Sequence, residues 1–199
     1  YILKLDPEFI GTDYESFDIG FIELQIAENY APSKWLILAQ AAFTLLVSCR
    51  LFYDGRRGIG YIREILKPMI DEKYPTRPER EATFIAGSSM GGLMALYGVA
   101  CYNHVFQRAA CLSPSLWLSA SNVMELVAKN KIANDTCIYM DYGALEMFNH
   151  AASAESLIST SHLLLTKRVN LALRVVPGGN HSEASWGRQI PVFMDCLGL

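Results

Sequence analysis

The sequence has no long run of basic residues and no strong excess of either charge. It contains 17 Lys and Arg against 20 Asp and Glu, which gives a formal net charge of −3. Proteins that bind nucleic acid or anionic membranes usually present a concentrated basic surface. The composition therefore argues against nucleic acid and against stable membrane association for this chain.

Closely spaced cysteine pairs are also missing. A disulfide framework or a zinc site needs paired ligands at short spacing, so we expect neither. Cysteines among apolar neighbours are typical of buried thiols, which favours a reducing, cytoplasmic compartment. The five cysteines, an odd number with no CxxC pair, are Cys49, Cys101, Cys111, Cys137 and Cys196.

No apolar run has the length of a comfortable membrane span. The longest, Trp35 to Val47, includes Gln40 and Thr44, whereas a spanning helix needs about 20 mostly apolar residues. We interpret it as a buried helix leading into a strand, with a membrane segment as the less favoured alternative. The opening residues lack the pattern of a secretory signal, and a start at Tyr1 fits a fragment or a processed form.

What is present is enough apolar material for a folded core. Of the 199 residues, 51% are hydrophobic, and this content with a low net charge excludes a disordered chain. No repeat or linker divides the sequence. We therefore expect a single domain over residues 1–199.

Short apolar runs alternate with helical patterns, which predicts an α/β fold with a largely parallel sheet and right-handed crossovers. The expected strands are 82–87, 106–112, 136–142 and 170–176. The expected helices between and after them are 90–102, 119–129, 151–167 and 183–196. Upstream, we expect a strand at 21–27, a helix at 33–42, a strand at 45–53 and an amphipathic helix at 58–73. In the helix at 58–73, Ile65 and Met69 fall on the apolar face and Lys67 on the exposed face, and Pro68 predicts a kink or a shorter helix.

The strongest motif is the segment from Gly87 to Gly92, GSSMGG, which contains GxSxG with Ser89 at its centre. An apolar strand precedes it and a helical pattern follows it, which is the setting that exposes a nucleophilic serine at a strained turn. The backbone N–H of Met90, at the start of the helix, then points toward a developing oxyanion. The alternative is an ordinary Gly/Ser turn, which the strand-turn-helix context makes less favoured.

A serine nucleophile needs a base, and His181 is the preferred candidate among four histidines. It follows the strand at 170–176 in the loop PGGNHSEASW, which places it at the same sheet edge as Ser89. The other three are better explained as loop, capping or surface residues: His104, His150 and His162.

The acid that orients the base is expected after the strand TCIYMDY. Asp141 and Glu146 are the two candidates. Asp141 still belongs to the strand, where its side chain faces one side of the sheet, whereas Glu146 follows Gly143 on the loop. We favour Glu146 and keep Asp141 as the alternative.

The chain from about Gly60 to its C-terminus is similar to a family of α/β-hydrolases. That family includes esterase D, feruloyl and acetyl-xylan esterases, and the ferric-enterobactin esterases. The matching segments are YIREILKPMIDEKYPT, TFIAGSSMGGLMALYG, CLSPSLW, YMDYGALE and PGGNHSEASW. The resemblance implies the α/β-hydrolase fold, with Ser89 as nucleophile, His181 as base and Glu146, in the word Gly143-Ala144-Leu145-Glu146, as acid.

The resemblance is weakest upstream, where family members carry an Asp-Gly or His-Gly word whose loop supplies a second oxyanion N–H. The only Asp-Gly pair here is Asp54-Gly55, close to the helix before the GxSxG turn, and the segment Glu28–Tyr30 is the other candidate for this loop. The leading strands of the family are expected to be shortened or missing. Two aromatic residues, Trp117 and Trp186, are candidates for a substrate pocket, with core or rim packing as the alternative.

These features together predict a serine carboxylic-ester hydrolase that acts on a small-molecule or sugar-linked ester and needs no metal or organic cofactor. An acyltransferase with the same three residues and a non-catalytic binding module of the same fold are the alternatives. A shortened sheet would leave an open edge, which favours pairing into a homo-oligomer.

Overall fold

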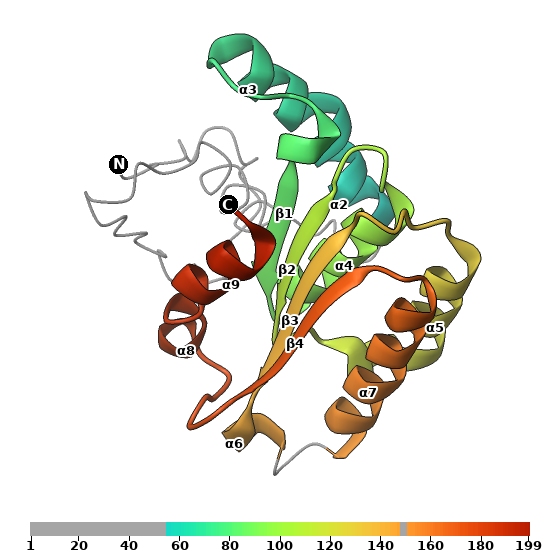
Figure 1. Cartoon of the computed structure of the whole chain (residues 1–199), viewed down its shortest axis with the longest axis vertical. Coiled ribbons are helices and arrows are strands. Elements are labelled where there is room, and N and C mark those ends of the chain that lie inside the picture. Colours follow the sequence, from blue (N-terminus) through green and yellow to red (C-terminus); the bar gives the residue numbers. More distant parts are fainter. Residues whose placement is uncertain (1–54, 148–150) are drawn as a thin grey trace, which may run out of the picture. The chain divides into compact units, whose positions relative to one another are not determined.

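Four parallel strands form the sheet at the centre of the described chain (Figure 1). The computed structural model describes residues 55–147 and 151–199, all within one compact unit. Within these ranges the strand order is β1-β2-β3-β4, and each pair of neighbours is parallel. The strands are β1 (Phe84–Ser88), β2 (Arg108–Leu112), β3 (Cys137–Gly143) and β4 (Asn170–Val176). The predicted α/β fold with a parallel sheet is confirmed, and each predicted strand lies within about two residues of an observed one.

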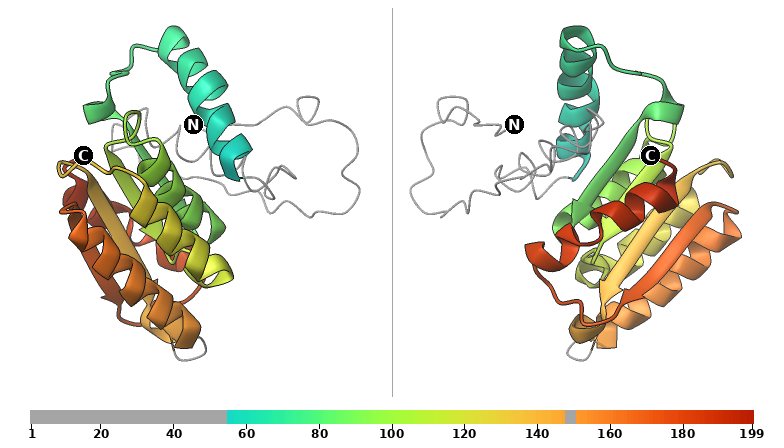
Figure 2. Two further views of the ribbon diagram at one scale, coloured as in Figure 1. Left: turned by 90° about the vertical axis from the view of Figure 1, so that its right-hand side faces the viewer. Right: turned by 60° about the vertical axis from the view of Figure 1, so that its left-hand side comes forward.

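The helices that connect the strands pack on one face of the sheet. Because the strand order follows the chain, right-handed crossovers that all step in one direction bring every connection to the same side. Figure 2 shows α4, α5 and α7 side by side on that face and α9 on the other. The connecting helices are α4 (Met90–Cys101), α5 (Ala120–Lys129) and α7 (Ala151–Thr166), and the last two are α8 (Glu183–Gly187) and α9 (Ile190–Leu197).

Alternating strand residues build a core on each side of the sheet. On β3, Ile138 and Met140 face the connecting helices, whereas Tyr139 faces α9 and packs near Phe193. This two-residue period is what a strand dictates, and both sets are apolar because the sheet is covered on both faces. The two cores hold the carboxyl ends of the strands in a fixed register.

The helical segment before β1 differs from the prediction in its middle. It runs as α2 (Gly55–Tyr61), a π-helical turn (Ile62–Leu66) and α3 (Lys67–Lys73). Pro68 lacks an N–H, and its ring crowds the preceding turn. The wider π turn before it makes room for the proline ring. The predicted kink is therefore a π turn rather than a break.

The π turn also shifts which side chains are buried. Lys67, expected on the exposed face, is buried, and its ammonium donates to Asp71 Oδ2 at 2.6 Å and to the Pro78 carbonyl at 2.9 Å. Ile65 and Met69, expected on the apolar face, are about half exposed. A π turn contains more residues than the 3.6 per turn of an α-helix. Buried and exposed positions predicted for a regular helix are therefore wrong for the residues after the π turn.

The predicted C-terminal helix at 183–196 is two helices. α8 ends at Gly187, and α9 begins at Ile190 with Pro191 in its first turn. Proline is tolerated in the first turn, where an N–H has no helical acceptor, and is disfavoured within a helix. The break therefore follows from Pro191, which the prediction of a single helix did not take into account.

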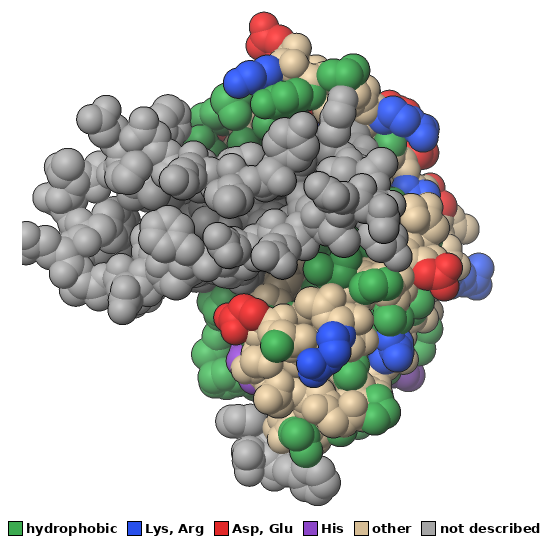
Figure 3. All heavy atoms as spheres, turned by 90° about the vertical axis from the view of Figure 1, so that its left-hand side faces the viewer, with side chains coloured by type: hydrophobic (Ala, Val, Ile, Leu, Met, Phe, Trp, Pro, Cys, Tyr) green, Lys and Arg blue, Asp and Glu red, His purple; other side chains and the backbone are tan. Residues whose placement is uncertain are grey.

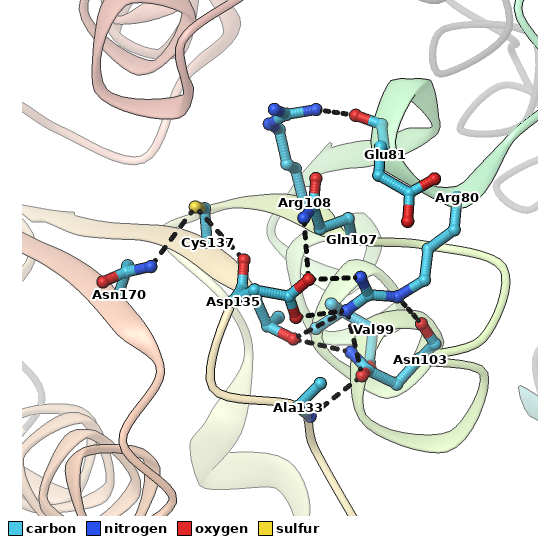
Figure 4. Close-up of polar contacts among 11 residues, drawn as sticks. Arg80, Glu81, Val99, Asn103, Gln107, Arg108, Ala133, Asp135, Cys137 and Asn170 are labelled. Atoms are coloured by element: carbon cyan, nitrogen blue, oxygen red, sulfur yellow. Dashed lines mark hydrogen bonds and ion pairs between the residues drawn. The ribbon is translucent and has the colours of Figure 1, made fainter.

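At the amino edge of the sheet, Arg80 joins three segments of the chain (Figure 4). Its guanidinium donates to both oxygens of Asp135, at 2.8 and 3.0 Å, and its Nε donates to the Asn103 carbonyl at 2.5 Å. The hydrogen bonds from Arg80 hold the pKa of Asp135 below its usual value. This cluster ties the entrance of β3 to the end of α4, at the edge of the sheet opposite Ser89.

Several predictions concern residues that the structure does not describe. These are the elements expected at 21–27, 33–42 and 45–53, the apolar run 35–47, the loop Glu28–Tyr30, Asp54, Cys49 and His150. The single domain over 1–199, the cytoplasmic location and the homo-oligomer stay predictions. No disulfide joins the cysteines of the described ranges.

The surface of the described residues carries no continuous field of one charge on the face drawn in Figure 3, where basic and acidic side chains are interspersed among polar and apolar ones. Among residues 55–147 and 151–199, no helix combines the length and the apolar character that a membrane crossing requires.

Candidate active site

Ser89 occupies a sharp turn between β1 and α4. Its backbone has φ 54° and ψ −120°, a conformation that non-glycine residues rarely adopt. A side chain at Gly87 would lie 2.4 Å from the carbonyl carbon and oxygen of Gly91, so only glycine permits the turn to close this tightly. The local sequence therefore forces Ser89 into a strained position at the carboxyl edge of the sheet.

Hydrogen bonds from the neighbouring strand fix this turn. The Ser89 N–H donates to the Leu112 carbonyl at 2.9 Å, and the Ser115 N–H donates to the Ser89 carbonyl at 3.1 Å. Ser89 is therefore held at backbone level by the end of β2 and the turn that follows it.

His181 lies within hydrogen-bond distance of the Ser89 hydroxyl. The loop after β4 carries the imidazole, and its Nε2 is 2.9 Å from Ser89 Oγ. The two residues are 92 positions apart in the chain, and they meet because parallel strands end at the same edge of the sheet. The imidazole side chain is about half exposed.

The other ring nitrogen of His181 faces Glu146. Glu146 lies in the short helix α6 (Ala144–Met147), and its Oε2 is 2.7 Å from His181 Nδ1. The carboxylate is buried, and its second oxygen accepts the Gly143 N–H at 2.9 Å. This arrangement fixes the proton on Nδ1 and leaves Nε2 as the acceptor for the Ser89 hydroxyl.

Asp141, the alternative acid, faces a different set of partners. Its Oδ2 accepts the Tyr139 hydroxyl at 2.7 Å and its Oδ1 accepts the Ser113 N–H at 3.1 Å. Burial raises the pKa of the Asp141 carboxyl, although these two hydrogen bonds oppose the rise. Asp141 therefore stabilises the sheet rather than the imidazole of His181.

Trp186, one of the two candidate pocket residues, packs against the base. Its ring meets the His181 imidazole edge to face, with 4.8 Å between centroids and an interplanar angle of 84°. Trp117 lies on the 3-10 turn Leu116–Ser119 and has 48% of its surface exposed. The role of either residue in a substrate pocket stays a prediction.

Two glycines bring the loops of the acid and the base together. A side chain at Gly143 would lie 2.4 Å from the carbonyl carbon and oxygen of Gly179, and the Leu145 N–H donates to the Gly179 carbonyl at 2.9 Å. The end of β3 therefore contacts the loop that carries His181 at backbone level. The sequence placed Gly143 at the end of the strand and in the word that carries Glu146, but it did not predict this contact with Gly179.

Replacing Gly143 with alanine is expected to destabilise the protein by about 2–3 kcal/mol, because the new methyl group has backbone rather than a movable side chain in its way. Gly187→Ala is the matched control, since a Cβ there meets nothing within 4 Å and alanine favours a helix. Urea unfolding measures both. Equal midpoints for the two variants would contradict the close approach of these loops.

Two further residues of the site were not predicted from the sequence. Ser113 Oγ donates to Glu146 Oε1 at 2.6 Å, and Ser115 Oγ lies 3.3 Å from Ser89 Oγ. Both belong to the segment CLSPSLW, which carries the family resemblance. The resemblance of that segment could have pointed to this turn as part of the site. A Ser-Pro-Ser turn after a strand does not, however, indicate which distant side chains it contacts.

Met90 carries the backbone N–H that the sequence predicts as an oxyanion donor. It is the first residue of α4, where an N–H has no acceptor within the helix. The positive end of the helix dipole adds to the attraction for an anion at this position. Of the Asp54-Gly55 pair, only Gly55, the first residue of α2, is described.

A family model described as “Putative esterase” matches residues 56–194. This range is more than two-thirds of the chain and includes Ser89, Glu146 and His181. The chain belongs to this esterase family. The resemblance found in the sequence is thereby confirmed.

Solved structures with this esterase fold are similar to the chain at low sequence identity. A ferulic acid esterase aligns with a TM-score of 0.57 and 18% identity, over 69% of this chain and 59% of its own. The enterobactin esterase FES from Shigella flexneri aligns with a TM-score of 0.58 and 20% identity, over 70% of this chain and 37% of its own.

A third structure is a fluorophosphonate-binding serine hydrolase F from Staphylococcus aureus. It aligns with a TM-score of 0.53 and 18% identity, over 69% of this chain and 62% of its own. The chain therefore spans less than two-thirds of each of these three proteins. Comparison with curated protein sequences gave no match.

Proposed function

We propose that this member of the esterase family hydrolyses carboxylic esters, with Ser89 as nucleophile, His181 as general base and Glu146 as the acid that orients the base. The observation that carries the proposal is the continuous series of hydrogen bonds from Glu146 through His181 to Ser89, with distances of 2.7 and 2.9 Å. A serine hydroxyl is a weak nucleophile by itself, and this arrangement is the one that activates it.

The strained turn at Ser89 supports the same proposal. Its positive φ between a strand and a helix is the geometry of a nucleophile elbow, which pushes the hydroxyl out of the sheet edge. The cost of this conformation is about 1–3 kcal/mol. A protein with no use for the Ser89 hydroxyl would gain stability from an unstrained turn.

In the first half of the proposed reaction, Ser89 Oγ attacks the carbonyl carbon of the ester while His181 Nε2 takes the hydroxyl proton. The tetrahedral oxyanion forms beside the Met90 N–H, which stabilises it. His181 then gives the proton to the oxygen of the departing alcohol, the carbon–oxygen bond breaks, and the acyl group stays on Ser89. Glu146 holds the imidazole in place and stabilises its charged form throughout.

In the second half, water takes the place of the alcohol. His181 Nε2 removes a proton from the water, the resulting hydroxide attacks the acyl carbon, and a second oxyanion forms beside Met90. Return of the proton to Ser89 Oγ releases the carboxylic acid and restores the site. The chemistry needs no metal or organic cofactor.

The proposed substrates are small or sugar-linked esters. Two of the similar structures are named as a ferulic acid esterase and an enterobactin esterase, and both names specify ester bonds. Trp186 beside His181 offers an apolar surface next to the reacting carbonyl. Simple acyl esters, acetylated or feruloylated sugars and cyclic trilactones are therefore the classes to compare.

A panel of p-nitrophenyl esters of increasing acyl length, run beside feruloyl and siderophore esters, tests the proposal. We expect saturable release of p-nitrophenolate with one equivalent of free acid per turnover. Added alcohol that captures most of the acyl group, with little free acid, would indicate an acyltransferase instead. No turnover above the buffer rate by folded protein would contradict the proposal.

The acid assignment predicts different outcomes for two carboxylates. Glu146→Gln is expected to lower kcat by about 10³–10⁴-fold, because the amide no longer stabilises the charged imidazole. Asp141→Asn keeps an oxygen for the Ser113 N–H, so kcat of the folded protein stays within several-fold while stability falls. Steady-state kinetics beside thermal unfolding checks both, and an equal loss of kcat in the two variants would overturn the assignment.

A further inference from the structure

The turn after β2, residues 113–115, forms hydrogen bonds with two of the three proposed catalytic residues, Ser89 and Glu146. Ser113 has φ 41° and is buried, and its N–H donates to the Asp141 carbonyl at 3.0 Å and to Asp141 Oδ1 at 3.1 Å. The Tyr142 hydroxyl donates to the Pro114 carbonyl. These contacts fix the turn to β3, so it is a rigid platform rather than an adaptable loop.

The proton positions at the Ser113 hydroxyl follow from its two partners. Trp186 Nε1 lies 3.0 Å from Ser113 Oγ, and an indole N–H is only a donor. Ser113 therefore accepts from Trp186 and directs its own proton to Glu146 Oε1 at 2.6 Å. Hydrogen-bond donation therefore runs in one direction, from the indole through the Ser113 hydroxyl to the carboxylate.

Both of these residues also contact His181. Glu146 Oε2 faces His181 Nδ1, and the Trp186 ring packs on the imidazole edge to face. The Ser113 hydroxyl bonds to Glu146 and Trp186 and not to the imidazole, so any effect on His181 passes through these two neighbours. A single buried hydroxyl thus connects the groups that set the position and the tilt of the ring.

We propose that Ser113 is a positioning residue for this site. Its hydroxyl holds Glu146 Oε1 so that Oε2 meets His181 Nδ1, and it holds the Trp186 indole against the imidazole. The inference rests on the proposed ester hydrolysis and adds a residue to it.

Kinetics of Ser113→Ala and Ser113→Gly test the proposal. Both remove the hydroxyl, and glycine also tolerates φ 41° without strain, so a shared loss belongs to the hydroxyl and not to the backbone. We expect kcat to fall by about 10- to 100-fold in both variants, since small misplacements of a catalytic group have effects of this size. KM is expected to stay within about twofold.

Ser161→Ala is the matched control. Ser161 is as buried as Ser113, but its hydroxyl has no hydrogen-bond partner among the described residues. We expect its kcat to equal that of the wild-type protein. A loss of kcat in Ser161→Ala as large as in Ser113→Ala would show a general effect of core truncation and would overturn the proposal.

Trp186→Phe separates a positioning role from a packing role. This variant keeps an aromatic ring against His181 but removes the N–H that Ser113 accepts. If Trp186, Ser113 and Glu146 act as one hydrogen-bonded unit, the double variant Ser113→Ala/Trp186→Phe is no slower than Ser113→Ala alone. If the fold-losses of kcat in the two single variants multiply in the double variant, Ser113 and Trp186 act independently, and the proposed unit is wrong.

The far-downfield proton resonance of His181 Nδ1–H gives a readout that does not depend on turnover. We expect it in the wild-type protein and in Ser161→Ala, and we expect it broadened or lost in Ser113→Ala and Ser113→Gly. An unchanged resonance and unchanged kcat in both Ser113 variants would overturn the inference while ester hydrolysis by the wild-type protein stood. A folded wild-type protein with no ester turnover would remove the proposed function and this inference together.

Discussion

Replacing Ser89 with alanine is expected to lower kcat for ester hydrolysis by about 10⁶-fold, because the acyl group has no oxygen to which it can transfer. A residual rate above that of buffer is expected, since the oxyanion donor and substrate binding remain. Initial rates with a p-nitrophenyl ester, measured on freshly purified protein, check this result.

The control for this variant is its neighbour in the chain. Ser88 is the last residue of β1 and has no part in the proposed chemistry, so Ser88→Ala is expected to keep kcat within several-fold of the wild-type value. If Ser89→Ala kept as much activity as Ser88→Ala, another residue would have to be the nucleophile. Equal thermal unfolding of the two variants would exclude misfolding as the cause of a difference.

The second large effect is expected at the base. His181→Ala is expected to lower kcat by about 10⁶-fold as well, since a serine without its base is about as unreactive as a site without the serine. Added imidazole is expected to restore part of the rate, because a small base can occupy the space left beside Trp186 and Glu146. The rate is measured with and without imidazole.

His162 provides the comparison for that experiment. It is exposed on α7, and His162→Ala is expected to leave kcat and its response to imidazole unchanged. Most of the activity surviving in His181→Ala, or the same loss in His162→Ala, would contradict the assignment of the base.

The sheet could be predicted because its strands are short apolar runs bounded by glycine, proline and polar residues. Parallel strands covered on both faces are apolar on both faces, so a run such as RAACL identifies a buried strand without an alignment. The same reasoning placed Ser89 and His181 at one edge, because Ser89 directly follows one strand and His181 lies in the loop after another. Their contact at 2.9 Å agrees with that expectation.

The choice between the two carboxylates followed from strand geometry. Asp141 belongs to β3 and pairs in register with Leu112 of β2 and Arg174 of β4, so its side chain faces one side of the sheet. Glu146 comes after the strand and is free to turn toward the loop of His181. The sequence could favour Glu146 but could not show that Asp141 accepts the Tyr139 hydroxyl.

Other features depend on contacts that no local pattern encodes. The burial of Lys67 results from a π turn ahead of Pro68, which periodicity alone does not show. The link from Ser113 to Glu146 joins positions 33 apart, and that from Ser113 to Trp186 joins positions 73 apart. Such pairs become visible only when the strands and loops are placed in space.

The most direct test of the account is the intact mass of the protein after treatment with a fluorophosphonate, followed by mapping of the modified peptide. The reagent forms a stable bond to an activated serine, and one of the similar structures is named for binding it. We expect a single adduct per chain, located on Ser89 and absent from Ser89→Ala and His181→Ala. Folded wild-type protein that gains no adduct, or gains it on another serine such as Ser115, would contradict the central claim that Ser89 is the activated nucleophile.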